Sequence, residues 1–198
     1  MAYFTKSEAR SAASVGRQVQ RSAGKTFDRI LKEEALSALG SATFDIFLSH
    51  AISDAELILG VKALLESQGF KVYVDWVEDP HLNRQSVSKE TADLLRRRMR
   101  QSKSLLYVAT DNASSSKWMP WELGFFDGFK PGCLAIMPIL ETDSAIFKGQ
   151  EYLNLYPVVR KGTYKNGDPD IFVEESGIKW TTLKRFGGGV PGWSAYTR

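Results

Sequence analysis

An aromatic ring and a carboxylate stand four residues apart in the run WMPWE, as Trp118 and Glu122. On a helix, side chains at this spacing lie on the same face, so the indole can cover the carboxylate and keep water away from it. The two residues therefore form a candidate catalytic pair, with Glu122 as the reacting charge. The structural alternative is a tryptophan of the hydrophobic core beside a glutamate that faces solvent.

Further polar residues come directly after short apolar runs that we interpret as strands. In an open parallel sheet, ligands bind beyond the carboxyl ends of the strands, where the strand order reverses. For the strand order 2-1-3-4-5 this point falls between strands one and three, and the Trp118–Glu122 pair follows strand three. The other residues that we expect at or near this edge are Ser49, His50, Asp75, Trp76, Thr110, Asp111 and Asn112.

Several common enzyme motifs are missing. The turn after the first strand reads SHAISD, without the glycines that let a backbone wrap a pyrophosphate, and no GxxxxGK[ST] motif occurs. Ser49 and His50 are adjacent, so on a strand they point to opposite faces, and without a GxSxG motif they do not indicate a hydrolase. With Cys133 and two histidines the chain has too few ligands for a structural zinc site, so no metal is expected.

Apolar runs that alternate with amphipathic stretches predict an open α/β domain with helices on both faces of a parallel sheet. The predicted strands span residues 44–49, 70–74, 104–110, 133–140 and 155–160. The first helix is expected to open on a capping box from Ser53 to Glu56 and to end at Gly69. We assign this domain to residues 41–162. Residues 163–198 are interpreted as a C-terminal extension of the same domain, with a hairpin or a final helix.

Residues 1–40 differ from the rest in charge. They carry seven Lys/Arg and four Asp/Glu, a net +3, whereas residues 41–198 carry nineteen of each. Apolar residues at helical spacing predict an amphipathic helix, and we interpret the segment as an N-terminal helical extension for docking or oligomerisation. An organelle transit peptide is the alternative. The apolar positions are Val15, Val19, Ala23, Phe27, Ile30 and Leu31.

The composition also excludes some partners and compartments. Residues 41–198 carry no net charge, which does not favour binding of nucleic acid, because domains that bind nucleic acid usually carry a basic excess. No apolar run reaches the roughly 18 residues of a membrane-spanning helix, and the first residues lack the apolar stretch of a secretory signal. We therefore expect a cytoplasmic protein that binds neither nucleic acid nor a membrane.

Two blocks of this sequence resemble the bacterial form of the TIR domain, the domain shared by Toll/interleukin-1 receptors and resistance proteins. The blocks are FDIFLSHAISDAELILGVKALLESQGFKVYVDW and SLLYVATDNASSSKWMPWELGFFDG, and the resemblance covers about residues 42–160. It implies a flavodoxin-like fold with a five-stranded sheet in the order 2-1-3-4-5. For the enzymatic members it also implies cleavage of the N-glycosidic bond of NAD⁺, with the family's catalytic glutamate at Glu122 and its WxxxE tryptophan at Trp118.

The resemblance also assigns a loop and shows one departure. The family's BB loop, which gates the site or mediates assembly, corresponds to Trp76–Gln85. Some members carry basic residues just after the position of His50, where this chain has Ala51 and Ile52. The phosphates of NAD⁺ must then be neutralised from elsewhere, and the candidates are Arg84, Lys117 or another subunit.

The implied chemistry needs one carboxylate. Nicotinamide leaves as a neutral molecule, so no general acid is required, and the barrier lies in forming a ribosyl oxocarbenium ion that Glu122 can stabilise. Trp76 or Trp118 can stack on a ring of the substrate, and Ser49, His50 and Asp75 complete the expected substrate-binding set. Water would give ADP-ribose, an internal hydroxyl a cyclic isomer, and a foreign nucleophile a conjugate.

The expected function is therefore an NAD⁺ glycohydrolase or cyclase in bacterial anti-phage defence, whose nucleotide product signals to an effector. NAD⁺ is the substrate, and no cofactor is expected. Activity is expected to require self-association through TIR–TIR contacts. A non-catalytic TIR scaffold that acts by association alone is the main alternative, and an enzyme acting on simple nucleosides is the second.

Overall fold

Each of the five apolar runs contains a strand in the computed structural model, which describes residues 1–22, 43–75, 88–175 and 177–196. The strands lie side by side in the order β3-β2-β4-β5-β6, and every neighbouring pair is parallel. This is the predicted 2-1-3-4-5 order of a flavodoxin-like sheet, so the fold prediction is confirmed. The strands are β2 (Phe44–Ser49), β3 (Val72–Tyr73), β4 (Ser102–Ala109), β5 (Leu134–Leu140) and β6 (Val158–Thr163).

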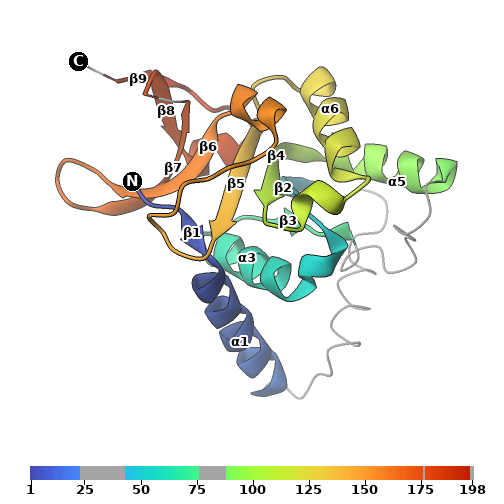
Figure 1. Cartoon of the computed structure of the whole chain (residues 1–198), viewed down its shortest axis with the longest axis horizontal. Coiled ribbons are helices and arrows are strands. Elements are labelled where there is room, and N and C mark those ends of the chain that lie inside the picture. Colours follow the sequence, from blue (N-terminus) through green and yellow to red (C-terminus); the bar gives the residue numbers. More distant parts are fainter. Residues whose placement is uncertain (23–42, 76–87, 176, 197–198) are drawn as a thin grey trace.

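The sheet continues past the five predicted strands into the C-terminal region. β7 (Pro169–Glu175), β8 (Lys179–Thr182) and β9 (Ser194–Ala195) add to the β6 edge as antiparallel neighbours. The short helix α7 (Leu183–Gly187) follows β8, so the region contains both a hairpin and a helix. Figure 1 shows these elements on the opposite side of the molecule from α5 and α6.

Helices cover both faces of the parallel strands. On one face lies α3 (Ala55–Ser67), and on the other lie α5 (Lys89–Arg100) and α6 (Met119–Phe129). Within β4, Leu106 and Val108 pack towards α3, whereas Leu105 and Tyr107 pack towards α5 and α6. Both faces of the strand are thus buried, which explains why its sequence is apolar without polar alternation.

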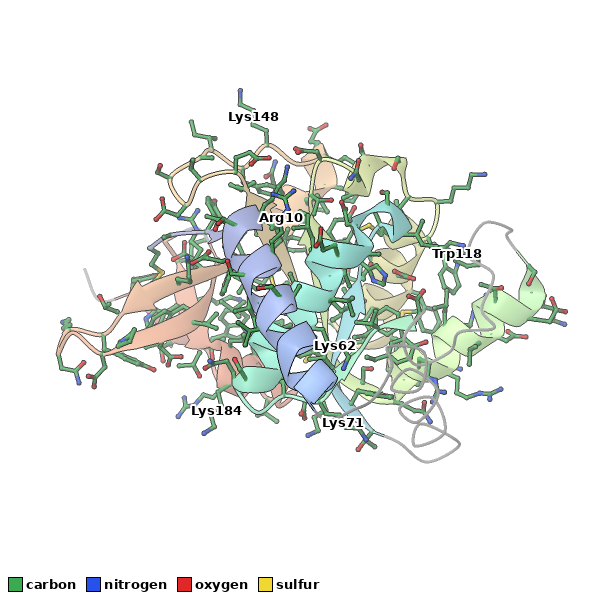
Figure 2. The ribbon with its side chains drawn as sticks, turned by 90° about the horizontal axis from the view of Figure 1, so that it is seen from below. Arg10, Lys62, Lys71, Trp118, Lys148 and Lys184 are labelled. Carbon is green, nitrogen blue, oxygen red and sulfur yellow. The ribbon has the colours of Figure 1, made fainter. Side chains whose placement is uncertain are left out.

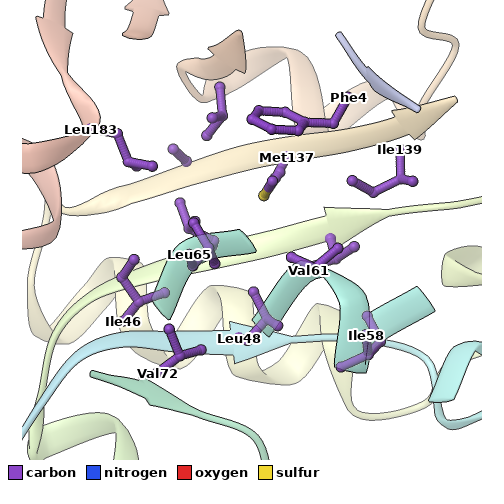
Figure 3. Packing of buried hydrophobic residues seen from close by; sticks show 14 of the residues in the cluster. Phe4, Ile46, Leu48, Ile58, Val61, Leu65, Val72, Met137, Ile139 and Leu183 are labelled. Atoms are coloured by element: carbon purple, nitrogen blue, oxygen red, sulfur yellow. The ribbon is translucent and has the colours of Figure 1, made fainter. Parts of the chain in front are cut away.

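The core on the α3 face joins both ends of the chain to the sheet. Phe4, near the N-terminus, and Leu183, in α7, belong to the same buried cluster as residues of β2, α3 and β5 (Figure 3). Phe4 lies in the short strand β1 (Phe4–Thr5), which pairs in parallel with the end of β5. The first residues therefore form part of the packed body of the protein.

The N-terminal helix packs through a different face from the one that the sequence suggests. In α1 (Lys6–Ser22) the side chains of Ala9 and Ala13 are buried, but Val15 is 61% exposed. The helix lies along α3 (Figure 2), where a Cβ on Gly60 would stand 1.8 Å from the carbonyl oxygen of Ala9. Small residues allow this close approach. Because Val15 is exposed, the expectation that it lies on the packing face is wrong. The other apolar positions of the stripe are outside the residues whose side chains are described.

The start of α3 also differs from the prediction. A 3₁₀ turn over Ile52–Asp54 precedes the helix, which begins at Ala55 without a side-chain cap, so the expected capping box from Ser53 is not formed. Gly69 follows the helix with φ +86, as expected for a left-handed end. No helix in the described parts of the chain has both the length and the apolar character that crossing a membrane demands.

Candidate active site

The carboxyl ends of β2 and β4 bring Ser49 and Tyr107 together. The two residues are register partners on neighbouring parallel strands, and both side chains point to the α6 side of the sheet. Side chains of register partners on one face are close neighbours, so a residue of α6 above them meets both. This position is the edge at which the strand order predicts a ligand site.

Glu122 lies in the first turn of α6, directly above this pair. Trp118 precedes the helix, and its carbonyl oxygen accepts a hydrogen bond from the backbone N–H of Glu122 at 2.8 Å. Pro120 stands within the first turn, where its missing N–H costs no helical hydrogen bond. The indole of Trp118 is buried and meets Trp121 edge to face, with ring centroids 5.4 Å apart. The sequence spacing therefore gives a helical turn that holds both residues of the predicted pair inside the protein.

The hydroxyl of Ser49 donates a hydrogen bond to Oε2 of Glu122 at 2.6 Å. Both side chains are 0% exposed, so the contact lies entirely out of water. Burial, the neighbouring Tyr152 and the charge of Glu122 together raise the pKa of Tyr107 above its ordinary value. A carboxylate in such a place acts on nearby charge through a weakly screening medium, so it can stabilise a cation strongly.

His50 and Asp75 form a second buried contact at the same edge. Nε2 of His50 lies 3.4 Å from Oδ1 of Asp75, and the two side chains are 0% and 1% exposed. Nδ1 of His50 lies 2.8 Å from the carbonyl oxygen of Leu48, which can only accept, so Nδ1 carries a hydrogen. The pair joins the end of β2 to the segment that follows β3.

A third buried carboxylate, Asp54, joins the turns after β2 and β4. Its Oδ2 accepts from the hydroxyl of Thr110 at 2.5 Å, and its Oδ1 accepts from the amide of Asn112 at 2.7 Å. The sequence places Thr110 and Asn112 at the edge but reads Asp54 as part of a helix cap. The missed signal is that an acidic side chain after one strand faces hydroxyl and amide side chains after the neighbouring strand.

The N-terminal segment reaches this edge as well. The ammonium of Lys6 donates to Oδ2 of Asp111 at 2.7 Å and to Oε1 of Glu141 at 2.5 Å. The lysine side chain is 14% exposed, whereas the two carboxylates are largely exposed. Lys6 thus ties the turns after β4 and β5 together, a contact that no local sequence pattern indicates.

A cavity of about 370 Å³ lies at the end of β4, and Glu122 is not among the residues that line it. Tyr107 lines it, and Thr110 and Asp111 line its β4 side. The opposite wall comes from the segment before β6, where the 3₁₀ turn Glu151–Leu155 replaces the beginning of the strand expected at 155. Tyr107 is not among the residues predicted for the site, although its alternation with Leu106 and Val108 could have placed its hydroxyl on the α6 face.

The structure thus joins Ser49 to Glu122 and His50 to Asp75, and it buries Trp118 beside them. The loop Trp76–Gln85, which includes Arg84, lies outside the described residues. Asp75, the residue before this loop, is described. Across the described ranges, no group of three or more His, Cys, Asp or Glu side chains could hold a metal ion.

Comparison of this sequence with known proteins finds similar proteins in bacteria. A Bacillus cereus (strain MSX-D12) protein named "Probable 3' cyclic ADP-D-ribose synthase ThsB'" is 42% identical over 190 residues, which cover 94% of this chain and 98% of that protein. A Cytobacillus dafuensis protein named "Putative cyclic ADP-D-ribose synthase TIR2" is 30% identical over 99 residues, which cover 50% of this chain and 26% of that protein. No protein-family model matches the chain.

Among solved structures, the TIR domain of the Toll-related receptor TRR-2 from Hydra magnipapillata matches with a TM-score of 0.43 and 18% identity. The match covers 57% of this chain and 79% of that chain.

Proposed function

This chain belongs to the bacterial TIR domain proteins, and from that premise we propose that it cleaves the bond between nicotinamide and ribose in NAD⁺ and releases a cyclic ADP-ribose. The name of the Bacillus cereus relative supports the cyclic product over the linear one. In the structure, the proposal is carried by the buried Ser49–Glu122 contact at the carboxyl edge of the sheet. We further propose that the cyclic product signals to an effector in anti-phage defence.

The reaction needs a charge that stabilises a transient cation. The C–N glycosidic bond breaks, its electron pair leaves with nicotinamide, and the anomeric carbon becomes positive. A hydroxyl oxygen elsewhere in the same molecule then bonds to that carbon and gives up its proton. Glu122 supplies the negative charge that stabilises the cation and an acceptor for the proton.

The neighbouring residues support this role of Glu122. The hydrogen bond from Ser49 fixes the direction of the carboxylate, because Oε2 must stay near the serine hydroxyl. The burial and mutual contact of His50 and Asp75 support a positioning role at the edge of the substrate site. Trp118 and Trp76 remain our proposed surfaces for stacking on a substrate ring.

The complete burial of Glu122 has a consequence for access. A side chain that is 0% exposed meets substrate only after neighbouring groups move. We propose that self-association of the chain provides this movement, so activity should rise faster than linearly with protein concentration. The same burial favours the second candidate function, a scaffold that associates with other TIR domains and uses Glu122 only to hold α6 on the sheet.

Turnover of purified protein separates the two candidates. The wild type is incubated with NAD⁺ at several protein concentrations, nicotinamide is measured by chromatography, and the nucleotide product is identified by mass and retention. Glu122→Gln keeps the shape but removes the charge, so its rate is expected to fall by about 100-fold or more. Glu90→Gln, in the exposed first turn of α5, is the matched control and should keep the wild-type rate.

Three results would each contradict part of the proposal. Release of nicotinamide by Glu122→Gln at the wild-type rate would remove the site assignment. A wild type that associates but releases no nicotinamide at any concentration would establish the scaffold instead. Linear ADP-ribose as the sole product would leave NAD⁺ cleavage intact and contradict the cyclisation step.

A further inference from the structure

A second and larger cavity, of about 710 Å³, lies in the C-terminal region and shares no lining residue with the cavity beside Tyr107. Most of its lining residues come from β7, β8, α7 and the turn between α3 and β3. Figure 1 shows β7 and β8 on the opposite side of the molecule from α6. A volume of this size suits a small-molecule ligand. The residues that line it are Gln68, Phe70, Tyr164, Asp170, Ile171, Trp180, Thr181, Thr182, Leu183, Lys184, Arg185, Gly192 and Ser194.

Aromatic side chains form part of its wall. Tyr164 and Trp180 both meet Phe172 edge to face, with ring centroids 5.2 Å and 5.5 Å from that ring. Because Phe172 is buried, it holds the two rings in place while each keeps part of its surface accessible. Phe70 adds a further ring from the α3 side. Fixed and partly open aromatic rings provide a surface on which a planar base can stack.

The charge of the lining is positive. Neither Lys184 nor Arg185 has a carboxylate within ion-pair distance among the residues that the structure describes. Asp170 also lines the cavity, where its Oδ2 accepts from the phenol of Tyr164 at 2.7 Å and its Oδ1 accepts from the N–H of Ile171 at 2.7 Å, and these neutral donors leave its negative charge in place. Two cations against one carboxylate therefore leave the described lining with a net positive charge.

The position of the two cations differs. Nη1 of Arg185 lies 3.6 Å from the point that a Cβ on Gly192 would occupy, so the guanidinium stands over the lining of the cavity. Lys184 also lines the cavity but is exposed, and Figure 2 shows its side chain extending outward from the edge of the molecule. The hydroxyls of Thr182 and Ser194 line the same cavity and can donate to an anion.

We propose that this cavity binds a nucleotide, with its base against Trp180 and Tyr164 and a phosphate at Arg185. An aromatic wall alone would suit many apolar ligands, and a lone cation would suit many anions. The two together select a molecule that joins a planar ring to a phosphate, because each half meets a surface that the other half cannot use. Binding here is separate from NAD⁺ cleavage and does not depend on Glu122.

Binding of AMP, which contains no nicotinamide to release, tests the proposal by calorimetry on the full chain. Wild type should bind AMP at least about tenfold more tightly than adenosine or inorganic phosphate, since each of these fills one half of the site. Arg185→Gln should lower the affinity for AMP by about tenfold and leave that for adenosine unchanged. Arg10→Gln, an exposed arginine on α1 that is labelled in Figure 2, is the matched control and should bind AMP as the wild type does.

Trp180→Leu removes the stacking surface and should weaken binding of AMP and adenosine alike by about tenfold. Circular dichroism tests whether this variant folds. If it does not fold, the comparison of AMP and adenosine binding by Arg185→Gln decides alone. Equal AMP affinity in wild type and Arg185→Gln overturns the proposal. So does the absence of AMP binding to folded wild type at about 1 mM ligand. Either failure leaves the nicotinamide assay, and so the proposed function, untouched.

Discussion

The carboxyl edge of the parallel strands and the antiparallel C-terminal region distribute their polar groups in opposite ways. At the edge, Ser49, Glu122 and Asp54 are buried and hydrogen-bonded inside the protein. In the C-terminal region, Lys184 and Arg185 are exposed around a cavity of about 710 Å³, against about 370 Å³ beside the edge. The larger cavity and the buried carboxylate of Glu122 therefore lie in different parts of this protein.

The difference follows from how the strands are covered. Helices pack on both faces of β2 and β4, so side chains at their ends fall inside the protein and must find partners there. The strands β7 and β8 bury few of their side chains, so polar groups on them stay hydrated. Equal substitutions in the two regions should therefore have unequal effects.

The largest difference is expected for aspartate. Asp54→Ala removes the acceptor of two hydrogen bonds and leaves the Thr110 hydroxyl and the Asn112 amide without their partner, so the free energy of unfolding should fall by about 3 kcal/mol. Asp170→Ala, in the C-terminal region, should lower it by about 0.5 kcal/mol, because its donors are exposed or only partly buried and water can replace the carboxylate as their partner. Urea unfolding measures both values, and equal losses would contradict the comparison.

A smaller difference is expected for serine. Ser49→Ala removes the donor that holds Glu122, so the free energy of unfolding should fall by about 1 to 2 kcal/mol, and release of nicotinamide should slow by about tenfold. Ser194→Ala, beside the larger cavity, should change both quantities little. Urea unfolding and the nicotinamide assay are run on both variants. A Ser49→Ala variant with full activity would show that Glu122 needs no support from β2.

The sequence predicts the edge better than the rest of the molecule. Ser49 and Glu122 could be placed near one edge because short apolar strands and helix periodicity are local patterns, while the order of the strands was implied by the resemblance to the TIR family. Asp54 could not, because the same residues also fit a helix cap, and its partners lie more than fifty residues away along the chain. The prediction that Val15 lies on the packing face of α1 was wrong, because α1 approaches α3 closely at Ala9 and Gly60. Such an approach depends on small residues, which carry no hydrophobic signal.

Two tyrosines, one in each region, have similar environments, so the difference between the two regions should vanish for them. The phenol of Tyr156, beside the parallel strands, donates to Asp127 at 3.1 Å, and that of Tyr196, in the C-terminal region, donates to Glu174 at 2.8 Å. Burial and the bonded carboxylate raise the pKa of Tyr156 to about 12, and burial and Glu174 do the same for Tyr196. Both side chains are half-buried, so neither region protects its tyrosine better.

Tyr156→Phe and Tyr196→Phe should therefore have small and equal effects. A protonated phenol with a raised pKa contributes stability that is fully present below its ordinary pKa of 10.0 and is lost as the pH rises through about 12. Each variant should be about 0.5 to 1 kcal/mol less stable than wild type at neutral pH, and the gap should close between these two pH values. Urea unfolding of all three proteins at a series of alkaline pH values measures the gap. A gap that closes for Tyr196→Phe but stays constant for Tyr156→Phe would extend the difference between the regions to half-buried groups, and depth of burial alone would no longer account for it.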